Sequence, residues 1–149
     1  SKTMSRKTER IGRHGEYYTA SILALESDTV SILPHGSHAD IIFELNDTLY
    51  KCQVKTKSKK TKGHNYWKFD LRRGSHTKER YYQQGQIDIY ALYAQPYGSI
   101  VFLSARHTKQ VASYIIKDHE MKINDSQMSL ASAIADLSTN ELQPNCNSY

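Results

Sequence analysis

The sequence is poor in cysteine and proline and has no long apolar segment. Of its 149 residues, two are cysteine and three are proline, and there is no run of about 18 apolar residues. We therefore expect neither a membrane span nor a secretion signal. Cys52 and Cys146 lie far apart and fit neither a disulfide framework nor a CxxC metal pair. These absences favour a cytoplasmic protein with reduced thiols.

The motifs of several protein classes are also missing. Seven histidines occur, but none forms an HExxH or comparable cluster, which disfavours zinc catalysis. An aromatic RNP-like strand motif is absent, which disfavours a common type of RNA-binding module. The chain has no internal repeats or proline-rich linkers, and its length suits one domain. We predict a single domain over 1–149, with a flexible tail at 1–9 and a polar tail at 138–149.

The positive charge is concentrated in one-fifth of the chain. The net charge is +5 at pH 7, whereas residues 51–80 contain eleven Lys or Arg and only two acids, Asp70 and Glu79. This segment therefore carries +9, and the other 119 residues sum to −4. Such asymmetry is typical of a protein that binds a polyanion. A solubilising face is the alternative, although such a face normally intersperses both signs.

Hydrophobic periodicity and turn signals predict both helices and strands. Helices are expected at 15–26, 77–84, 108–117 and 126–137. Strands are expected at 29–33, 39–45, 48–56, 66–71, 87–94 and 99–104. The pattern predicts an α/β fold in which a mixed sheet is flanked by helices.

The strands on either side of Asn46-Asp47 can be aligned residue by residue. Asn and Asp tolerate the left-handed conformation that a two-residue type I′ turn requires. With this turn, Asp40 pairs with Gln53, and Lys55 projects from the same face of the ribbon. The opposite face is predicted to be core, because its side chains are apolar or nearly so: Ile41, Phe43, Leu45, Tyr50, Cys52 and Val54.

The polar face of this hairpin has the groups of a metal-dependent hydrolytic site. The Asp40 carboxylate and the Gln53 amide oxygen can share a hard divalent cation such as Mg²⁺, and the carbonyl of Val54 can add a third oxygen. Lys55 can orient or deprotonate a water molecule, or stabilise negative charge on a phosphate in the transition state.

A further carboxylate would strengthen this site. Glu16, near the start of the predicted first helix, is the first choice and Glu9 the second. Each residue also has an ordinary structural explanation: Asp40 as a turn residue, Gln53 as a surface amide and Lys55 as the start of a solvated loop. Their common face opposite an apolar face favours the functional interpretation.

These residues resemble the pattern of the PD-(D/E)XK nuclease superfamily. The resemblance spans roughly 15–56. Within the superfamily, the spacing is similar to that of archaeal-type Holliday junction resolvases. The small size, the glutamine and the basic loop are similar to homing endonucleases encoded in transfer-RNA introns. The matching segments are Gly15-Glu16, His38-Ala39-Asp40-Ile41-Ile42 and Gln53-Val54-Lys55-Thr56.

The resemblance implies a restriction-endonuclease-like fold that cuts double-stranded DNA with Mg²⁺. It assigns Glu16, Asp40, Gln53 and Lys55 to active-site positions. It also implies a homo-oligomer, because each subunit holds one cleavage site and cutting a duplex requires two. The intron-encoded type points to a tetramer, with a dimer as the alternative.

The sequence departs from the superfamily pattern at two positions. His38-Ala39 stands where a proline usually precedes the aspartate, and Gln53 replaces the usual acid. An amide donates an oxygen but brings no charge, so metal binding should weaken unless Glu16 compensates. We expect a sequence-specific, homing-type double-strand DNA endonuclease. The alternatives are a structure-selective Holliday junction resolvase and a non-catalytic DNA-binding protein on a nuclease fold.

Most of the basic side chains are expected to contact DNA. Lysines mostly meet phosphates, which position a protein without reading sequence and make its affinity fall with salt. Arginine, asparagine and histidine side chains between 65 and 76 are better candidates for reading bases, with phosphate contact alone as the alternative. The expected DNA-binding set is Lys57, Lys59, Lys60, Lys62, His64, Asn65, Lys68, Arg72, Arg73, His76, Lys78 and Arg80.

Overall fold

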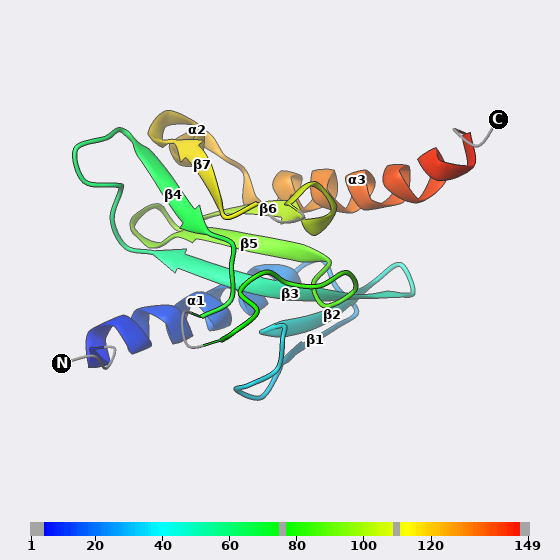
Figure 1. The fold of residues 1–149 in the computed structure, drawn as a ribbon, viewed down its shortest axis with the longest axis horizontal. Helices are drawn as coiled ribbons and strands as arrows, with labels where there is room; N and C mark the ends of the chain where they lie inside the picture. The colour runs from blue at the N-terminus through cyan, green and yellow to red at the C-terminus, as the bar shows by residue number, and fades with distance from the viewer. Residues whose placement is uncertain (1–4, 75–76, 109–110, 147–149) are drawn as a thin grey trace.

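The computed structural model describes residues 5–74, 77–108 and 111–146, and its centre is a five-stranded mixed sheet (Figure 1). The sheet order is β1-β2-β3-β5-β6, in which β3 and β5 are parallel and the other neighbours antiparallel. The strands of this sheet are β1 (Thr29–Ile32), β2 (Ile41–Leu45), β3 (Thr48–Lys57), β5 (Ile89–Ala94) and β6 (Ser99–Ser104). The predicted α/β class with a mixed sheet is confirmed.

The remaining elements form two layers, one on each face of this sheet. The helices are α1 (Arg6–Ala24), α2 (Asp118–Ile123) and α3 (Ser126–Cys146), with short 3-10 turns η1 (Gln95–Tyr97) and η2 (Ala105–Thr108). A second sheet is a two-stranded ribbon of β4 (Tyr66–Asp70) and β7 (Ser113–Lys117). Within the described residues, no helix is long and apolar enough to cross a membrane.

The two faces of the main sheet are covered differently. On one face, α1 and α3 pack on alternate residues of β3 and β5, and this cluster includes Leu23, Cys52, Val54, Ile89, Ala91 and Leu130. On the other face lies the β4–β7 ribbon, and this second cluster includes Trp67, Phe69, Tyr90, Leu92 and Ile116. In Figure 1, β4 crosses over the sheet. Side chains of β5 are therefore buried on both faces.

The hairpin between β2 and β3 has the predicted turn and register. Asn46 and Asp47 have φ angles of 52° and 64°, the left-handed values that a type I′ turn needs. Ile41 pairs with Cys52 and Phe43 with Tyr50 in an antiparallel ladder. The apolar face of this hairpin lies in the core as predicted, with the side chains of Ile41, Phe43 and Cys52 fully buried.

Both terminal helices are longer than the sequence pattern suggests. The Ser5 side chain accepts a hydrogen bond from the Thr8 N–H at 3.1 Å and caps α1, which begins at Arg6 rather than at residue 15. Residues 6–9 therefore belong to a helix and not to a tail. Helix α3 continues to Cys146, beyond the predicted end at residue 137. The polar residues 138–146 are thus helical rather than a tail.

Two predicted helices are wrong. The described residues of 77–84 form no helix, because Arg80 and Arg73 bond one another's backbone: the Arg73 N–H donates to the Arg80 carbonyl, and Arg80 Nη2 donates to the Arg73 carbonyl at 2.9 Å. The segment 108–117 ends in strand β7, in which Ile116 pairs with the buried Trp67 of β4. This non-local pairing overrides the local helical period.

Candidate active site and basic cleft

A glycine brings α1 into direct contact with β3. Gly15 is buried, and a Cβ atom at this position would lie only 1.8 Å from Oγ1 of Thr56. A residue with any side chain would therefore hold the helix away from the strand. The close approach places Glu16, the next residue of α1, beside β3.

Strands β2 and β3 separate where Asp40 lies. Their ladder ends at the pair Ile41 and Cys52. The backbone N–H of Asp40 then donates to the Cys52 carbonyl, and Oδ2 of Asp40 accepts a hydrogen bond from the Val54 N–H, both at 2.9 Å. Asp40 thus bonds to the residues on either side of Gln53, Cys52 and Val54, and does not form the predicted regular pair with Gln53. Its carboxylate lies at the edge of β3.

This edge of β3 also presents a backbone oxygen. From Cys52 to Lys57, the other edge of β3 pairs with β5. The N–H and C=O of one residue in a strand point to the same side. Because the Val54 N–H points to Asp40, the Val54 carbonyl faces the same edge. The carboxylate and the carbonyl that we expect to act together therefore share one side of the strand.

The two carboxylates of the candidate site interact. Partial burial and, to a lesser extent, the negative charge of Asp40 together raise the pKa of Glu16 to about 7. Burial also raises the pKa of Asp40, opposed by the Val54 N–H and by the positive charge of Lys55. Asp40 therefore lies close enough to Glu16 and to Lys55 to shift the pKa of each, although the three residues come from α1, the segment before β2, and β3.

Lys55 lies half-buried beneath the end of β4. Its Nζ donates a hydrogen bond to the backbone carbonyl of Arg72 at 2.6 Å. Burial lowers the pKa of Lys55, opposed by the charges of Asp70 and Asp40. Gln53 is also half-buried, and strand alternation places it on the same face of β3 as Lys55.

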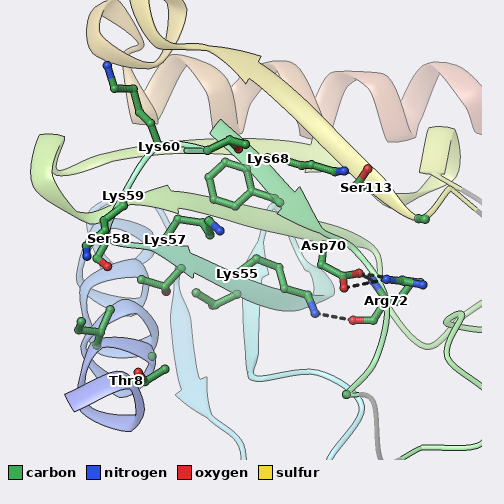
Figure 2. Close-up of a pocket in the computed structure, with 18 of the residues that line it drawn as sticks. Thr8, Lys55, Lys57, Ser58, Lys59, Lys60, Lys68, Asp70, Arg72 and Ser113 are labelled. Carbon is green, nitrogen blue, oxygen red and sulfur yellow. Dashed lines mark hydrogen bonds and ion pairs between the residues drawn. The ribbon is translucent and has the colours of Figure 1, made fainter. Parts of the chain in front are cut away.

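A cleft of about 1060 Å³ opens beside Lys55 (Figure 2). Its walls come from the N-terminal half of α1, the end of β3 with the loop that follows, β4, and the residues after β4. Nine cationic side chains line it, against one acid, Asp70. The cations are Lys55, Lys57, Lys59, Lys60, Lys62, Lys68, Arg72, Arg73 and Arg80.

The cleft contains most of the predicted DNA-binding residues that the structure describes. Lys57, Lys59, Lys60, Lys62, Lys68, Arg72, Arg73 and Arg80 line it, whereas His64, Asn65 and Lys78 do not. His64 stacks on Tyr66 instead, with ring centroids 4.7 Å apart. The Oδ1 atom of Asn65 accepts a hydrogen bond from Lys60 at 3.1 Å. His76, the remaining predicted contact, lies outside the described residues.

Sequence reasoning missed one wall of this cleft. Thr8, Ile11 and Gly12 of α1 line it, because the helix starts nine residues earlier than predicted. A signal was present in the sequence: Ser5 is a favourable N-cap, and Glu9 follows in the first turn. Asp70 was also not among the predicted site residues.

The candidate metal ligands are of mixed type. No group of three or more His, Cys, Asp or Glu side chains that could hold a metal ion occurs among the described residues. Glu16 and Asp40 contribute two carboxylates, while Gln53 and the Val54 carbonyl could add uncharged oxygens. A donor set made of oxygen alone, in which the charge of Asp40 makes Glu16 harder to ionise without a cation, fits a hard ion such as Mg²⁺.

The fold is shared with a homing endonuclease. A solved structure with a similar fold is that of the bacterial homing endonuclease I-Ssp6803I. The TM-score is 0.61 and the identity 19%, and the match covers 74% of this chain and 76% of that one. No protein-family model and no curated protein matches the sequence. At this level of identity, the likeness concerns the fold.

Proposed function

We propose that this protein is a divalent-metal-dependent endonuclease that hydrolyses phosphodiester bonds of double-stranded DNA. The observation that carries the proposal is that Asp40 lies close to both Glu16 and Lys55. Lys55 in turn lines a cleft with nine cations and one acid, which Glu16 and Asp40 do not line themselves. The fold shared with a bacterial homing endonuclease and the resemblance to the PD-(D/E)XK pattern support it.

The side chains of the site would take different roles. Asp40, Glu16, Gln53 and the carbonyl of Val54 would hold Mg²⁺. When bound, such an ion polarises a phosphoryl oxygen and lowers the pKa of a bound water. Lys55 Nζ would orient the attacking water and exchange a proton with it, because burial lowers the pKa of this amine.

The cleft would bind one strand of the substrate through its phosphates. Lysines on the loop after β3 and arginines after β4 lie on opposite sides of Lys55, so a phosphate held between them would reach the amine (Figure 2). We propose homing-type sequence specificity, with Arg72 and Arg73 as base-reading candidates, because arginine can bond a guanine edge with two donors. We propose that the protein acts on this DNA in the cytoplasm.

A duplex cut also requires a second copy of the site. The described residues contain one convergence of Glu16, Asp40 and Lys55, which can act on one strand at a time. We therefore propose a homo-oligomer, a tetramer in preference to a dimer. Sedimentation equilibrium with and without duplex DNA would measure its mass.

A non-catalytic DNA-binding protein is the second candidate. Gln53 supplies no charge where the superfamily pattern has an acid, and among the described residues only Glu16 and Asp40 remain as carboxylates for a cation at this site. In that case the cleft would bind DNA with the same salt dependence, but magnesium would produce no nicks or breaks.

Incubation of a supercoiled plasmid library with the protein and Mg²⁺ separates the two candidates. We expect nicked and linear products that disappear with a chelator. Lys55→Ala should reduce the cleavage rate by about 10²–10⁴-fold, the usual contribution of a positioned acid or base, with little change in binding. Lys57→Ala, on the same face of β3, is the matched control and should weaken binding while cleavage persists.

Two results would decide against the proposal, one from this assay and one from a companion assay that compares four-way junctions with linear duplex. If neither wild type nor Lys55→Ala cleaves the plasmid, the non-catalytic DNA-binding candidate is favoured. Cleavage of four-way junctions in preference to linear duplex would favour a structure-selective resolvase over a homing enzyme.

A further inference from the structure

Asp70 is the single acid among the described residues that line the basic cleft. It ends β4, and its side chain is 50% exposed. An exposed carboxylate in a cleft that binds phosphates repels the ligand, so its position requires a compensating role.

The Asp70 carboxylate accepts hydrogen bonds from both the backbone and the side chain of Arg72. Oδ1 accepts hydrogen bonds from the backbone N–H of Arg72 at 2.9 Å and from its Nε at 3.0 Å, and Oδ2 accepts from Nη2 at 3.1 Å. This is a two-pronged pair of the strong, geometrically specific kind. Arg80 adds Nη2 at 3.7 Å from Oδ2. One carboxylate thus fixes both the main chain and the guanidinium of Arg72.

The main chain fixed in this way holds the amine of the candidate site. The carbonyl of Arg72 accepts the hydrogen bond from Lys55 Nζ at 2.6 Å, as Figure 2 shows. Lys55 comes from β3 of the main sheet, whereas Arg72 follows β4 of the separate ribbon. The path from Asp70 through the Arg72 peptide to Lys55 therefore connects the ribbon to the reaction site.

We propose that Asp70 is a positioning residue, which holds the Arg72 peptide so that its carbonyl anchors Lys55 Nζ at the site of DNA cleavage. This inference rests on the proposed nuclease function. The carboxylate weakens DNA binding, because it repels phosphates and occupies Arg72, and in return it keeps the amine of Lys55 in place. Removing its charge should therefore change binding and cleavage in opposite directions.

Asp70→Asn tests this opposition. The amide is isosteric, but it cannot accept the two-pronged bond from Arg72. Its single oxygen can accept the Arg72 N–H only through a neutral hydrogen bond, which is about half as strong as the bond to a carboxylate, so the Arg72 peptide is held less firmly. We expect the dissociation constant of a short fluorescent duplex to fall about twofold to fivefold, the size expected for one exposed charge. The cleavage rate at saturating plasmid should fall by about 10–100-fold, since a displacement of about 1 Å can cost 10²-fold.

Two further variants separate positioning from general damage. Glu79→Gln makes the same change in charge, lies outside the cleft and keeps an acceptor for the Tyr81 N–H, so it should affect neither measurement. Asp70→Glu restores the carboxylate, so it should return binding to the wild-type value and recover part of the cleavage rate.

The possible results each decide the question. Slower cleavage with tighter binding in Asp70→Asn, but not in Glu79→Gln, supports the inference. Wild-type cleavage by Asp70→Asn, or a parallel loss of binding and cleavage, overturns it while leaving the nuclease proposal intact, provided that wild type cuts and Lys55→Ala does not. A wild type that binds DNA and never cuts it overturns both.

Discussion

The two walls of the basic cleft are held by different forces. The packed wall consists of Thr8, Ile11 and Gly12 of α1 with β3, and the contact of Gly15 with Thr56 fixes it. The charged wall consists of Asp70, Arg72, Arg73 and Arg80, and ion pairs and backbone hydrogen bonds fix it. Closely packed groups are held in one arrangement by their neighbours. Exposed ion pairs are weak, so their side chains can exchange one ionic partner for another.

This difference separates the two tasks of the candidate site. Glu16 follows Gly15 in α1 and Asp40 directly precedes β2, so the carboxylates proposed to hold the metal come from the packed elements behind this wall. Cations that must release one anion and accept another belong to the charged wall and the loop after β3. Substitutions in the packed wall should therefore change stability and catalysis, while those among the cations should change affinity and its dependence on salt.

Gly15→Ala should cause the largest change in stability, because the added methyl group would overlap Oγ1 of Thr56. We expect a loss of about 1–3 kcal/mol in unfolding free energy, the usual cost of overpacking, measured by urea denaturation. Displacement of α1 should also move Glu16 and slow cleavage. Adding Thr56→Ala should restore part of the loss.

Gly12→Ala is the matched control for this substitution. Gly12 lies in the same helix, and a Cβ atom there would have no neighbour within 4 Å. This variant should gain about 0.5–1 kcal/mol, because alanine favours the helix over glycine. Equal effects of the two variants would contradict a packed wall.

Glu16→Gln should have an intermediate effect that depends on pH. The pKa of Glu16 is raised from 4.5 to about 7 in the folded protein. Between these values the folded state keeps a proton that the unfolded state releases, so this group makes stability fall as pH rises through that range. Without added metal, the variant should match wild type near pH 4 and be more stable at pH 8.

The gain at pH 8 should be on the order of 1 kcal/mol, because solvent screens this half-exposed group. Thermal unfolding across this pH range measures it. The same variant should lose any stabilisation of the wild type by Mg²⁺. If the variant were less stable than wild type at pH 8 without metal, ionisation of Glu16 would not destabilise the folded protein, against this prediction.

Lys59→Gln should cause the smallest change, in affinity alone. Lys59 lines the cleft, whereas Lys78, which is also an exposed lysine of the basic segment, does not. Loss of one phosphate contact should reduce the slope of log K against log salt by about 0.9, with the cleavage rate at saturation unchanged. Lys78→Gln should leave this slope at the wild-type value. Identical slopes for the two variants would mean that DNA does not enter the cleft.

The parts of the fold that the sequence predicts correctly depend on local rules. Asn46-Asp47 specifies the type I′ turn, and this turn fixes the β2–β3 register and the buried face that includes Phe43. The irregular end of the ladder was not predictable, because Asp40 bonds the edge of β3 through its side chain. No alternation pattern encodes such a bond.

Other parts depend on contacts between distant residues. Strand β7 pairs with β4, more than forty residues earlier, and of its apolar side chains only Ile116 is buried. The local sequence of β7 therefore lacks the alternation of buried and exposed side chains that identifies a strand, and a helix was predicted in its place. In 77–84, charged residues with good helix propensity bond to backbone groups instead of following a helical period, as Arg80 does with Arg73. Composition located the basic segment, but which of its cations line the cleft depends on the course of the chain.

Asp40→Asn provides the most direct test of the central claim, that the hairpin carboxylate and its neighbours form a phosphodiester-hydrolysing site. An amide can still accept the Val54 N–H, so the hairpin should remain intact. Asp88→Asn is the control, because Asp88 accepts the Lys51 N–H of the same strand at 2.8 Å and does not line the cleft. The measurement is the single-turnover cleavage rate of saturating duplex DNA with Mg²⁺. We predict a loss of about 10³-fold or more for Asp40→Asn, with undiminished DNA binding, and a near wild-type rate for Asp88→Asn. Equal cleavage rates for wild type and Asp40→Asn would contradict the claim.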